Sequence, residues 1–222
     1  DSILGKNAQA FKNYYNVTAQ GNFRGKNILN CLNMPITYEN TNQLNDSRRK
    51  MLIARNKRDR PSWDDKILTD WNGQTIYSLA FASAVFKKPE WLVLAKSAWN
   101  FIIKEMGGQT DSANITHLKH SIRNGKVSNF SFLDDYADMC RAGLMLYQLS
   151  SQEIYKSHVE YWIKILDQEF WDNTRGGYYY TPKAADPLII REKPVYDLER
   201  PSGNGILVGV LLHLYSYTFK TN

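Results

Sequence analysis

Apolar residues recur about every 3.6 positions in five segments between residues 70 and 219. In one of these segments Ala95 and Ile102 share a face, and Pro89 stands in the first turn, where its missing N–H leaves no hydrogen bond unmade. The spacing therefore predicts helices over residues 70–86, 89–106, 132–149, 152–170 and 204–219. The apolar faces also carry three tryptophans that we expect in the core: Trp91, Trp99 and Trp162.

The first 60 residues have a different pattern. Residues 1–45 are rich in Asn, Gln and Tyr with little periodicity, so we expect mostly irregular structure with short helical or extended pieces. A basic helix is predicted from residue 46 to about residue 55. It ends before Pro61, because a residue that precedes proline disfavours helical geometry.

The lengths of the connections arrange the five predicted helices. Short links after residues 86 and 149 join the first two pairs as antiparallel hairpins. The connections 107–131 and 171–203 are long and contain strand signals, with a hairpin turn predicted at Asn124-Gly125 and another start at "RGGYYYT". The helices that begin near residues 70, 132 and 204 should therefore start at one common end, together with the long loops.

Acidic residues gather at this end. Asp64 and Asp65 precede the first helix, Asp134 and Asp135 open the third, and Asp197 with Glu199 precedes the fifth. One acid per helix is explained by capping, which contributes about 0.5–2 kcal/mol, but a second acid is not. Capping is the favoured interpretation for Asp134 and for Asp70, whereas capping and a site role are balanced for Asp64 and Asp65.

Facing carboxylates suit glycoside hydrolysis, in which one acid donates a proton and the other activates water or attacks the sugar. The candidate catalytic residues are Asp64, Asp65, Asp134 and Asp135. Aromatic and polar side chains near the same end are candidates for binding a sugar: Trp63, Lys66, Trp71, Asn72, Tyr136, Trp171, Arg191, Asp197, Ser202 and Asn204.

Two further features leave alternatives open. In "RPSGNG" (200–205), Ser202 either caps the last helix or, with the nearby amides and Asn204, holds a ligand. Four histidines are interpreted as structural, although one in the last helix could face a central cavity: His117, His120, His158 and His213. Their spacing does not resemble a metal site, so no metal and no cofactor are expected.

Composition narrows the functional classes. The 222-residue chain has a net charge of +6, and seven basic against two acidic residues between Asp46 and Arg60 supply +5 of it. We interpret this run as a solvated helix face and expect no nucleic-acid partner; a nucleic-acid binder would lose affinity steeply with salt.

Cys31 and Cys140 form no CxxC pair, which favours free thiols in a reducing, cytoplasmic compartment. No apolar run approaches a membrane span of ~20 residues.

Several motifs together resemble the helical-toroid part of the YyaL-type proteins, which include the spermatogenesis-associated protein with a thioredoxin-like amino-terminal domain. The matching segments, in the family's order, are "GNFRGKNIL" (21–29), "KRDRPSWDDKILTDWNG" (57–73), "FLDDYAD" (132–138), "GGYYYT" (176–181) and "RPSGNG" (200–205). The resemblance implies an all-α, (α/α)6 toroid of the six-hairpin glycosidase type, similar to sugar epimerases and unsaturated glycuronyl hydrolases. It does not imply one settled reaction.

The family motif positions carried over to this chain are Asp64, Asp65, Lys66, Trp71, Asn72, Gly73, Asp134, Asp135, Tyr136, Asp197, Pro201, Ser202, Gly203 and Asn204. The chain also departs from the family pattern. Gln74-Thr75 replace a usual Leu-Met, Ser62 replaces a frequent histidine, and Leu198-Glu199 replace a usual Gly-Ala. Glu199 is therefore not carried over as a functional residue.

From these observations we expect a single, incomplete toroid domain over residues 1–222, with short β-hairpins at one rim and without the family's thioredoxin-like domain. Asp1 in place of methionine is consistent with a piece of a longer protein. A partial ring leaves apolar faces uncovered, which predicts self-association or pairing with the missing part of the toroid. The predicted function is a carbohydrate-active enzyme that takes a sugar or small-molecule ligand. A hydrolase is favoured over an epimerase. The alternative is a non-catalytic sugar-binding or protein-interaction module.

Overall fold

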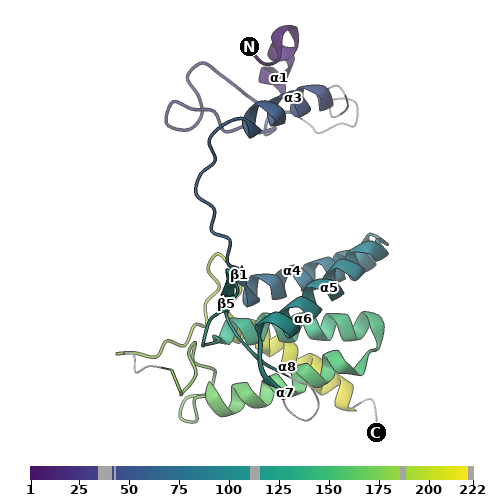
Figure 1. Cartoon of the computed structure of the whole chain (residues 1–222), viewed down its shortest axis with the longest axis vertical. Helices are drawn as coiled ribbons and strands as arrows, with labels where there is room; N and C mark the ends of the chain where they lie inside the picture. Colours follow the sequence, from purple (N-terminus) through teal and green to yellow (C-terminus); the bar gives the residue numbers. More distant parts are fainter. Residues whose placement is uncertain (35–41, 43, 111–115, 186–188, 220–222) are drawn as a thin grey trace. The chain divides into compact units, whose positions relative to one another are not determined.

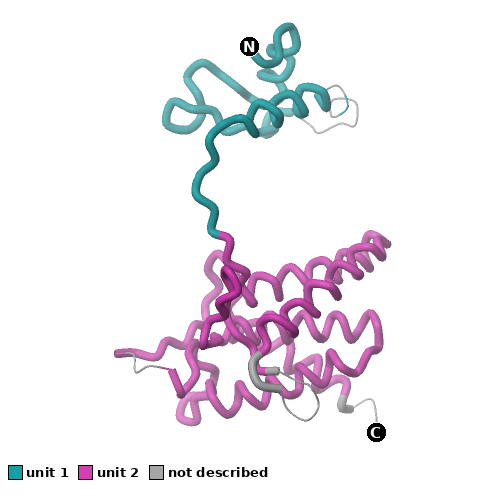
Figure 2. The backbone as a smooth tube through the Cα atoms, in the orientation of Figure 1, with its two compact units in different colours: residues 1–64 teal, residues 65–222 magenta. Residues whose placement is uncertain are grey.

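The computed structural model describes residues 1–34, 42, 44–110, 116–185 and 189–219. The chain forms two compact units, residues 1–64 and residues 65–222 (Figure 2). Each unit is described by itself, and the expectation of one domain over the whole chain stays a prediction.

The first unit is built from short helices: η1 (Gly5–Asn7), α1 (Ala8–Tyr14) and α3 (Asn45–Asn56). Its small core joins α1 to the start of α3 through Leu4, Ala8, Phe11, Tyr14 and Leu44. The predicted basic helix is confirmed as α3. The hydroxyl oxygen of Tyr15 accepts a hydrogen bond of 2.6 Å from Arg48 Nε, which ties α3 to the end of α1.

The second unit contains all five helices predicted by the apolar spacing, with ends within about two residues of the prediction. They are α4 (Thr69–Val85), α5 (Pro89–Met106), α6 (Leu133–Ser150), α7 (Glu153–Glu169) and α8 (Gly203–Phe219) (Figure 1). Pro89 stands at the start of α5, as its missing N–H requires. The turn from α6 into α7 is made by Ser151 in the left-handed region, with φ of 55°.

Helix α6 lies at the centre of this unit and packs against α4, α7 and α8, while α5 packs against α4. Helix α4 approaches α6 closely at Gly73, because a Cβ added there would come within 2.9 Å of the backbone and Cβ of Asp138. Only a glycine allows this approach. The inner helices α4, α6 and α8 therefore form one row, and α5 and α7 are their antiparallel partners.

The core lies mainly between α5, α6 and α7. Trp99 and Trp162 are buried there with ring centroids 5.5 Å apart, as the apolar spacing predicts. Trp91 is a correction to that prediction, because it is only half-buried and lines a groove beside α4. Among the described residues, no helix has both the length and the apolar character that crossing a membrane needs.

The long connection between α5 and α6 contributes to two small antiparallel sheets. One joins β4 (Ser121–Arg123) and β5 (Lys126–Val127) to β1 (Ile67–Leu68), which precedes α4, and the other pairs β2 (Gly107–Thr110) with β3 (Thr116–Leu118). The predicted turn at Asn124-Gly125 is confirmed, with φ values of 50° and 73°. Ile67 pairs with Ile122, so the hairpin is attached to the strand that leads into α4. This attachment places the loop side chains beside the starts of the inner helices.

Candidate functional site

Helices α4, α6 and α8 begin together at one end of the second unit, which we call the rim, and Arg200 connects them. Arg200 Nη1 donates to Asp70 Oδ2 in the first turn of α4, and Arg200 Nη2 lies 2.8 Å from Asp134 Oδ2 in the first turn of α6. The carboxylates are buried, whereas the Arg200 side chain is 30% exposed. One guanidinium therefore neutralises two buried acids and keeps an open side.

His120 and Asp135 form a second polar pair at the rim. His120 Nδ1 lies 3.0 Å from Asp135 Oδ1. The Asp135 side chain is fully buried and also accepts hydrogen bonds from the backbone N–H groups of Phe132 (2.8 Å) and Asp70 (3.1 Å). Asp135 thus caps α6 and joins it to α4, while His120 remains 25% exposed. The hydrogen bond to Asp135 raises the pKa of His120 above its ordinary value.

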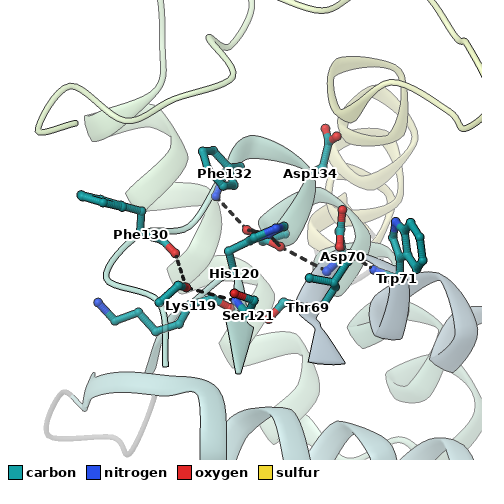
Figure 3. A network of polar contacts seen from close by, with 12 residues as sticks. Thr69, Asp70, Trp71, Lys119, His120, Ser121, Phe130, Phe132 and Asp134 are labelled. Carbon is teal, nitrogen blue, oxygen red and sulfur yellow. Dashed lines mark hydrogen bonds and ion pairs between the residues drawn. The ribbon is translucent and has the colours of Figure 1, made fainter. Parts of the chain in front are cut away.

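The backbone on both sides holds His120 in place. The His120 N–H donates to the Phe130 carbonyl at 2.8 Å, and the His120 carbonyl accepts from the Thr69 N–H at 2.8 Å. The imidazole meets Phe132 edge-on at 4.9 Å between centroids, and Phe132 stacks on Tyr180 at 5.0 Å. Figure 3 shows His120 between Phe132 and Asp70. The sequence places this histidine in a loop, and these contacts hold both its backbone and its ring.

Helix α6 carries two further buried acids, Asp134 at the rim and Asp138 one turn below it. Asp134 Oδ1 is buried and, among the described residues, makes no hydrogen bond of good geometry. Burial raises the pKa of Asp134, whereas Arg200 and the amide of Gly203 oppose the rise. One turn further, burial raises the pKa of Asp138 to about 7, against hydrogen bonds from Gln74 and the charge of Arg141. Burial thus raises the pKa of both acids, Asp134 and Asp138.

Asp70, His120 and Asp135 bring one potential metal-ligand atom each within 4.8 Å of one another. These groups already hold hydrogen bonds, because Asp70 accepts from Arg200 and Asp135 accepts from two backbone amides and lies against His120 Nδ1. A cation would have to displace the guanidinium. We assign no metal here, and the expectation of no metal and no cofactor stays a prediction.

Only part of the predicted site residues meet at the rim. Asp134 and Asp135 do, with the different roles described above. Asp197 accepts a hydrogen bond from the Ser202 N–H at 2.9 Å, and Ser202 Oγ accepts one from the Gly205 N–H at 3.1 Å. Asn204 bonds the backbone N–H and carbonyl of Tyr178. Ser202 and Asn204 therefore serve to start α8 and hold its loop, which supports the capping alternative for "RPSGNG".

Other predicted residues belong to the first unit, are buried in the core, or make the separate contacts given below. Trp63 and Asp64 belong to the first unit, where they line a pocket with Arg55 and Arg58. Tyr136 is buried in the core, so it offers no face to a sugar. Asp65 pairs with Arg123 at 2.5 Å, and Lys66 and Trp71 are exposed. The side chain of Asn72 donates a hydrogen bond to the Leu68 carbonyl, and that of Arg191 donates one to the Thr181 carbonyl. Trp171 packs on Tyr178.

Three members of the rim network were missed from the sequence: Asp70 was interpreted as a cap, His120 as structural, and Arg200 only as part of a turn. For Arg200 a signal did exist, because several acids at one rim need a cation and Arg200 immediately precedes α8. For His120 no local pattern distinguishes it from the neighbouring His117. Arg200, Asp134 and Tyr180 also line a small pocket of about 150 Å³, which opens the network to solvent.

The chain is similar in sequence to known proteins, although no protein-family model matches it. It is 27% identical over 183 residues to spermatogenesis-associated protein 20 of Homo sapiens and 28% identical over 184 residues to that of Mus musculus. Each alignment covers 79% of this chain but only 23% of the relative. The chain thus spans about a quarter of the length of these relatives, and the resemblance drawn from the motifs is confirmed.

Solved structures share the fold. D-mannose isomerase aligns with a TM-score of 0.55 and 13% identity, over 93% of this chain and 48% of that one. The GH76 alpha-mannanase of Bacteroides thetaiotaomicron gives 0.52 and 13%, over 81% and 47%. The cellobiose 2-epimerase of Spirochaeta thermophila gives 0.50 and 19%, over 71% and 39%. The expected fold class, a partial α/α toroid, is confirmed, and identities this low carry nothing beyond the fold.

Proposed function

We propose that the second unit binds a sugar at the rim and transfers a proton on it, as isomerisation or epimerisation requires, with His120 as the acid and base. The observation that carries this proposal is the pairing of a partly exposed imidazole with the fully buried carboxylate of Asp135. A histidine oriented in this way is a common arrangement for general acid–base catalysis.

The chemistry follows from how Asp135 holds the ring. A carboxylate at Nδ1 favours the tautomer with the proton on Nδ1, which leaves Nε2 as the atom that accepts a proton from the substrate. Isomerisation of an aldose moves one proton from C2 to C1, while the O2 hydroxyl proton passes to O1 as the carbonyl shifts from C1 to C2. A single base can serve both proton transfers at carbon. The pKa of His120 is raised, which keeps the protonated form available for the return step.

Arg200 supports the same reaction from the opposite side of the network. Its guanidinium pairs with Asp70 and Asp134 and lines the small pocket together with Tyr180. A positive charge that is partly exposed beside the base can donate hydrogen bonds to a carbonyl or enediolate oxygen of a sugar. Arg200 is thereby proposed to stabilise the negative charge that develops on the ligand.

A second candidate is glycoside hydrolysis, favoured by Asp134. Its Oδ1 is buried without a hydrogen bond of good geometry among the described residues, and burial raises its pKa. Such a carboxyl group is suited to donate a proton to a leaving glycosidic oxygen, with Asp70 as the second carboxylate. The two reactions use different residues, which makes them separable by mutation.

The test uses the full chain with D-mannose, D-glucose and cellobiose in D2O, followed by NMR for deuterium at C2 and for product sugars. We expect exchange with the wild-type protein and a loss of about 100-fold or more with His120→Asn. The matched control is Asp65→Asn, another polar group near the hairpin, which should retain exchange. Circular dichroism verifies that each variant is folded.

Three outcomes contradict the isomerase assignment. Exchange that persists in His120→Asn removes His120 from the reaction. Release of 4-nitrophenol from nitrophenyl glycosides that is lost in Asp134→Asn, but kept in His120→Asn, supports the hydrolase instead. If sugars bind, by calorimetry, but neither exchange nor release is detected, the unit is a non-catalytic sugar-binding module.

A further inference from the structure

Three consecutive tyrosines in the connection between α7 and α8 meet three different surroundings: Tyr178, Tyr179 and Tyr180. Tyr178 is buried in the core, and its hydroxyl donates to Asp167 Oδ1 at 2.8 Å. The ring of Tyr179 packs against the guanidinium of Arg191, which lies 4.2 Å from the ring centroid. Tyr180 is half-buried and lines the small pocket of about 150 Å³ at the rim, here called the rim pocket. Of the three, Tyr180 is therefore the one that borders the proposed site.

Backbone and ring contacts hold Tyr180 beside the start of α6. Its carbonyl accepts a hydrogen bond of 2.9 Å from the Leu133 N–H, and its N–H donates to the Glu192 carbonyl at 2.8 Å. The Tyr180 ring stacks on Phe132 with an angle of 9° between the planes, and Phe132 in turn meets the imidazole of His120. His120 and Tyr180 thus belong to one row of rings, with a single aromatic ring between them.

Two charged neighbours act on the Tyr180 hydroxyl. Burial raises the pKa of Tyr180 and the carboxylate of Asp134 raises it further, whereas the guanidinium of Arg200 opposes the rise. The phenol is therefore protonated throughout the neutral pH range. A protonated phenol is both a donor and an acceptor, so it can give a proton to one oxygen and take a proton from another. Arg200, which is proposed to hold the ligand oxygens, lines the same pocket.

The two reactions of the proposed function differ in what happens to the protons on oxygen. When His120 removes the proton at C2, the C2–H electron pair forms the second bond of C1=C2, and the carbonyl electrons move onto O1. Epimerisation then returns a proton to the opposite face of C2, and O2 keeps its own proton. Isomerisation instead requires that O1 gains a proton and that O2 loses one. An isomerase therefore needs a group that moves protons at O1 and O2, besides the base that acts at carbon.

We propose that Tyr180 moves this proton, so that the rim converts an aldose into a ketose rather than into its C2 epimer. The Tyr180 hydroxyl gives its proton to O1 and takes the proton of O2, and the O2–H electrons form the C2=O2 bond. The electrons of the C1=C2 bond take the proton from His120 at C1. Both residues return to their starting states, and no oxidant or further proton is consumed. The inference rests on the proposed function and selects one of its two reactions.

The test follows two rates in the full chain with D-mannose in D2O: the entry of deuterium at C2 and the formation of the ketose, both by NMR. Tyr180→Phe keeps the ring that stacks on Phe132 and removes only the hydroxyl. We expect it to lower ketose formation by about 100-fold. Deuterium should still enter at C2, because His120 and Arg200 are retained. The matched control is Tyr179→Phe, which removes the neighbouring hydroxyl outside the rim pocket and should leave both rates unchanged.

Failure of this inference can be told from failure of the proposed function. If Tyr180→Phe forms the ketose as fast as the wild type, or loses exchange and ketose formation in equal proportion, Tyr180 does not move the proton between the oxygens. A wild-type protein that exchanges C2 but yields only the C2 epimer also overturns the inference, and leaves proton transfer by His120 in place. Absence of C2 exchange in the wild type contradicts the proposed function itself. Circular dichroism and calorimetry with D-mannose verify that Tyr180→Phe is folded and binds the sugar.

Discussion

The chain contains two Asp-Asp pairs, Asp64-Asp65 and Asp134-Asp135, and they meet opposite environments. Asp64 is exposed in the first unit, and the Asp65 side chain is 49% exposed and pairs with Arg123. Asp134 and Asp135 are buried in the first turn of α6, one against Arg200 and the other against His120. The same dipeptide thus serves as solvated surface in one region and as structural and candidate catalytic charge in the other.

The difference shows that position in the fold sets the energetic value of a carboxylate. An exposed ion pair such as Asp65 with Arg123 contributes about 0–1 kcal/mol, since water competes for both partners. A buried carboxylate with three donors around it cannot lose its partners without leaving them unpaired in the interior. Three experiments sharpen this contrast, beginning with the largest expected effect.

Asp135→Ala should lower the free energy of unfolding by about 3–5 kcal/mol. It removes the acceptor for the N–H groups of Phe132 and Asp70 and the partner of His120, all beside a fully buried position. Urea denaturation followed by circular dichroism measures the change.

The matched control is Asp65→Ala, the corresponding residue of the first pair. We expect a change within about 0.5 kcal/mol, as for a surface position. Equal losses for the two variants would show that the contrast between the pairs is wrong.

Arg200→Met should cost somewhat less, about 2–3 kcal/mol, because Arg200 is partly exposed and water can approach the two acids that it leaves behind. Its removal leaves Asp70 and Asp134 facing each other without a cation. Adding Asp134→Asn to Arg200→Met should restore part of the stability, since one of the two charges is then gone. If the double variant is less stable than Arg200→Met by the full cost of Asp134→Asn alone, the two residues do not interact.

The smallest effect concerns pH. Because the folded pKa of His120 is raised above the ordinary 6.5, its pair with Asp135 contributes stability that is fully present below about pH 6.5. This contribution is lost as pH rises through the raised pKa. The melting temperature of wild type minus that of His120→Phe should therefore shrink by a few degrees between pH 6 and pH 9. Asp138, whose pKa is about 7, is present in both proteins, so its titration cancels. A difference that is constant with pH contradicts the ion pair.

Local signals were sufficient for the helices and the hairpin. The apolar period located all five helices of the second unit, Pro89 marked the start of α5, and Asn124-Gly125 marked the turn. Each of these features acts within a few residues of itself, so a sequence displays it directly. The prediction that Trp91 lies in the core was wrong, because the apolar period does not show whether a neighbouring helix covers a given face. Trp91 instead lines an open groove beside α4.

The candidate site was less accessible to prediction, since its members come from three separate segments. The loop lengths correctly brought α4, α6 and α8 to one end, and this placed Asp134 and Asp135 at the rim. The loop lengths did not distinguish Asp65 from Asp70, which lie on either side of β1. Of the two, only Asp70, in the first turn of α4, is buried. The choice of His120 depends on its backbone contacts with Thr69 and Phe130, which no motif encodes.

The ion pair between Arg200 and Asp70 joins residues 130 positions apart in the chain. Contacts of such separation form late in folding, because the entropy of closing the loop is lost before the contact is gained. During synthesis α4 and α6 emerge before Arg200, so Asp70 and Asp134 lack this cationic partner until Arg200 has been synthesised. We therefore expect the helical hairpins to fold first and the rim last. A nascent chain that has not yet produced Arg200 and α8 would leave Asp70 and Asp134 at the rim without the cation that joins them in the folded unit.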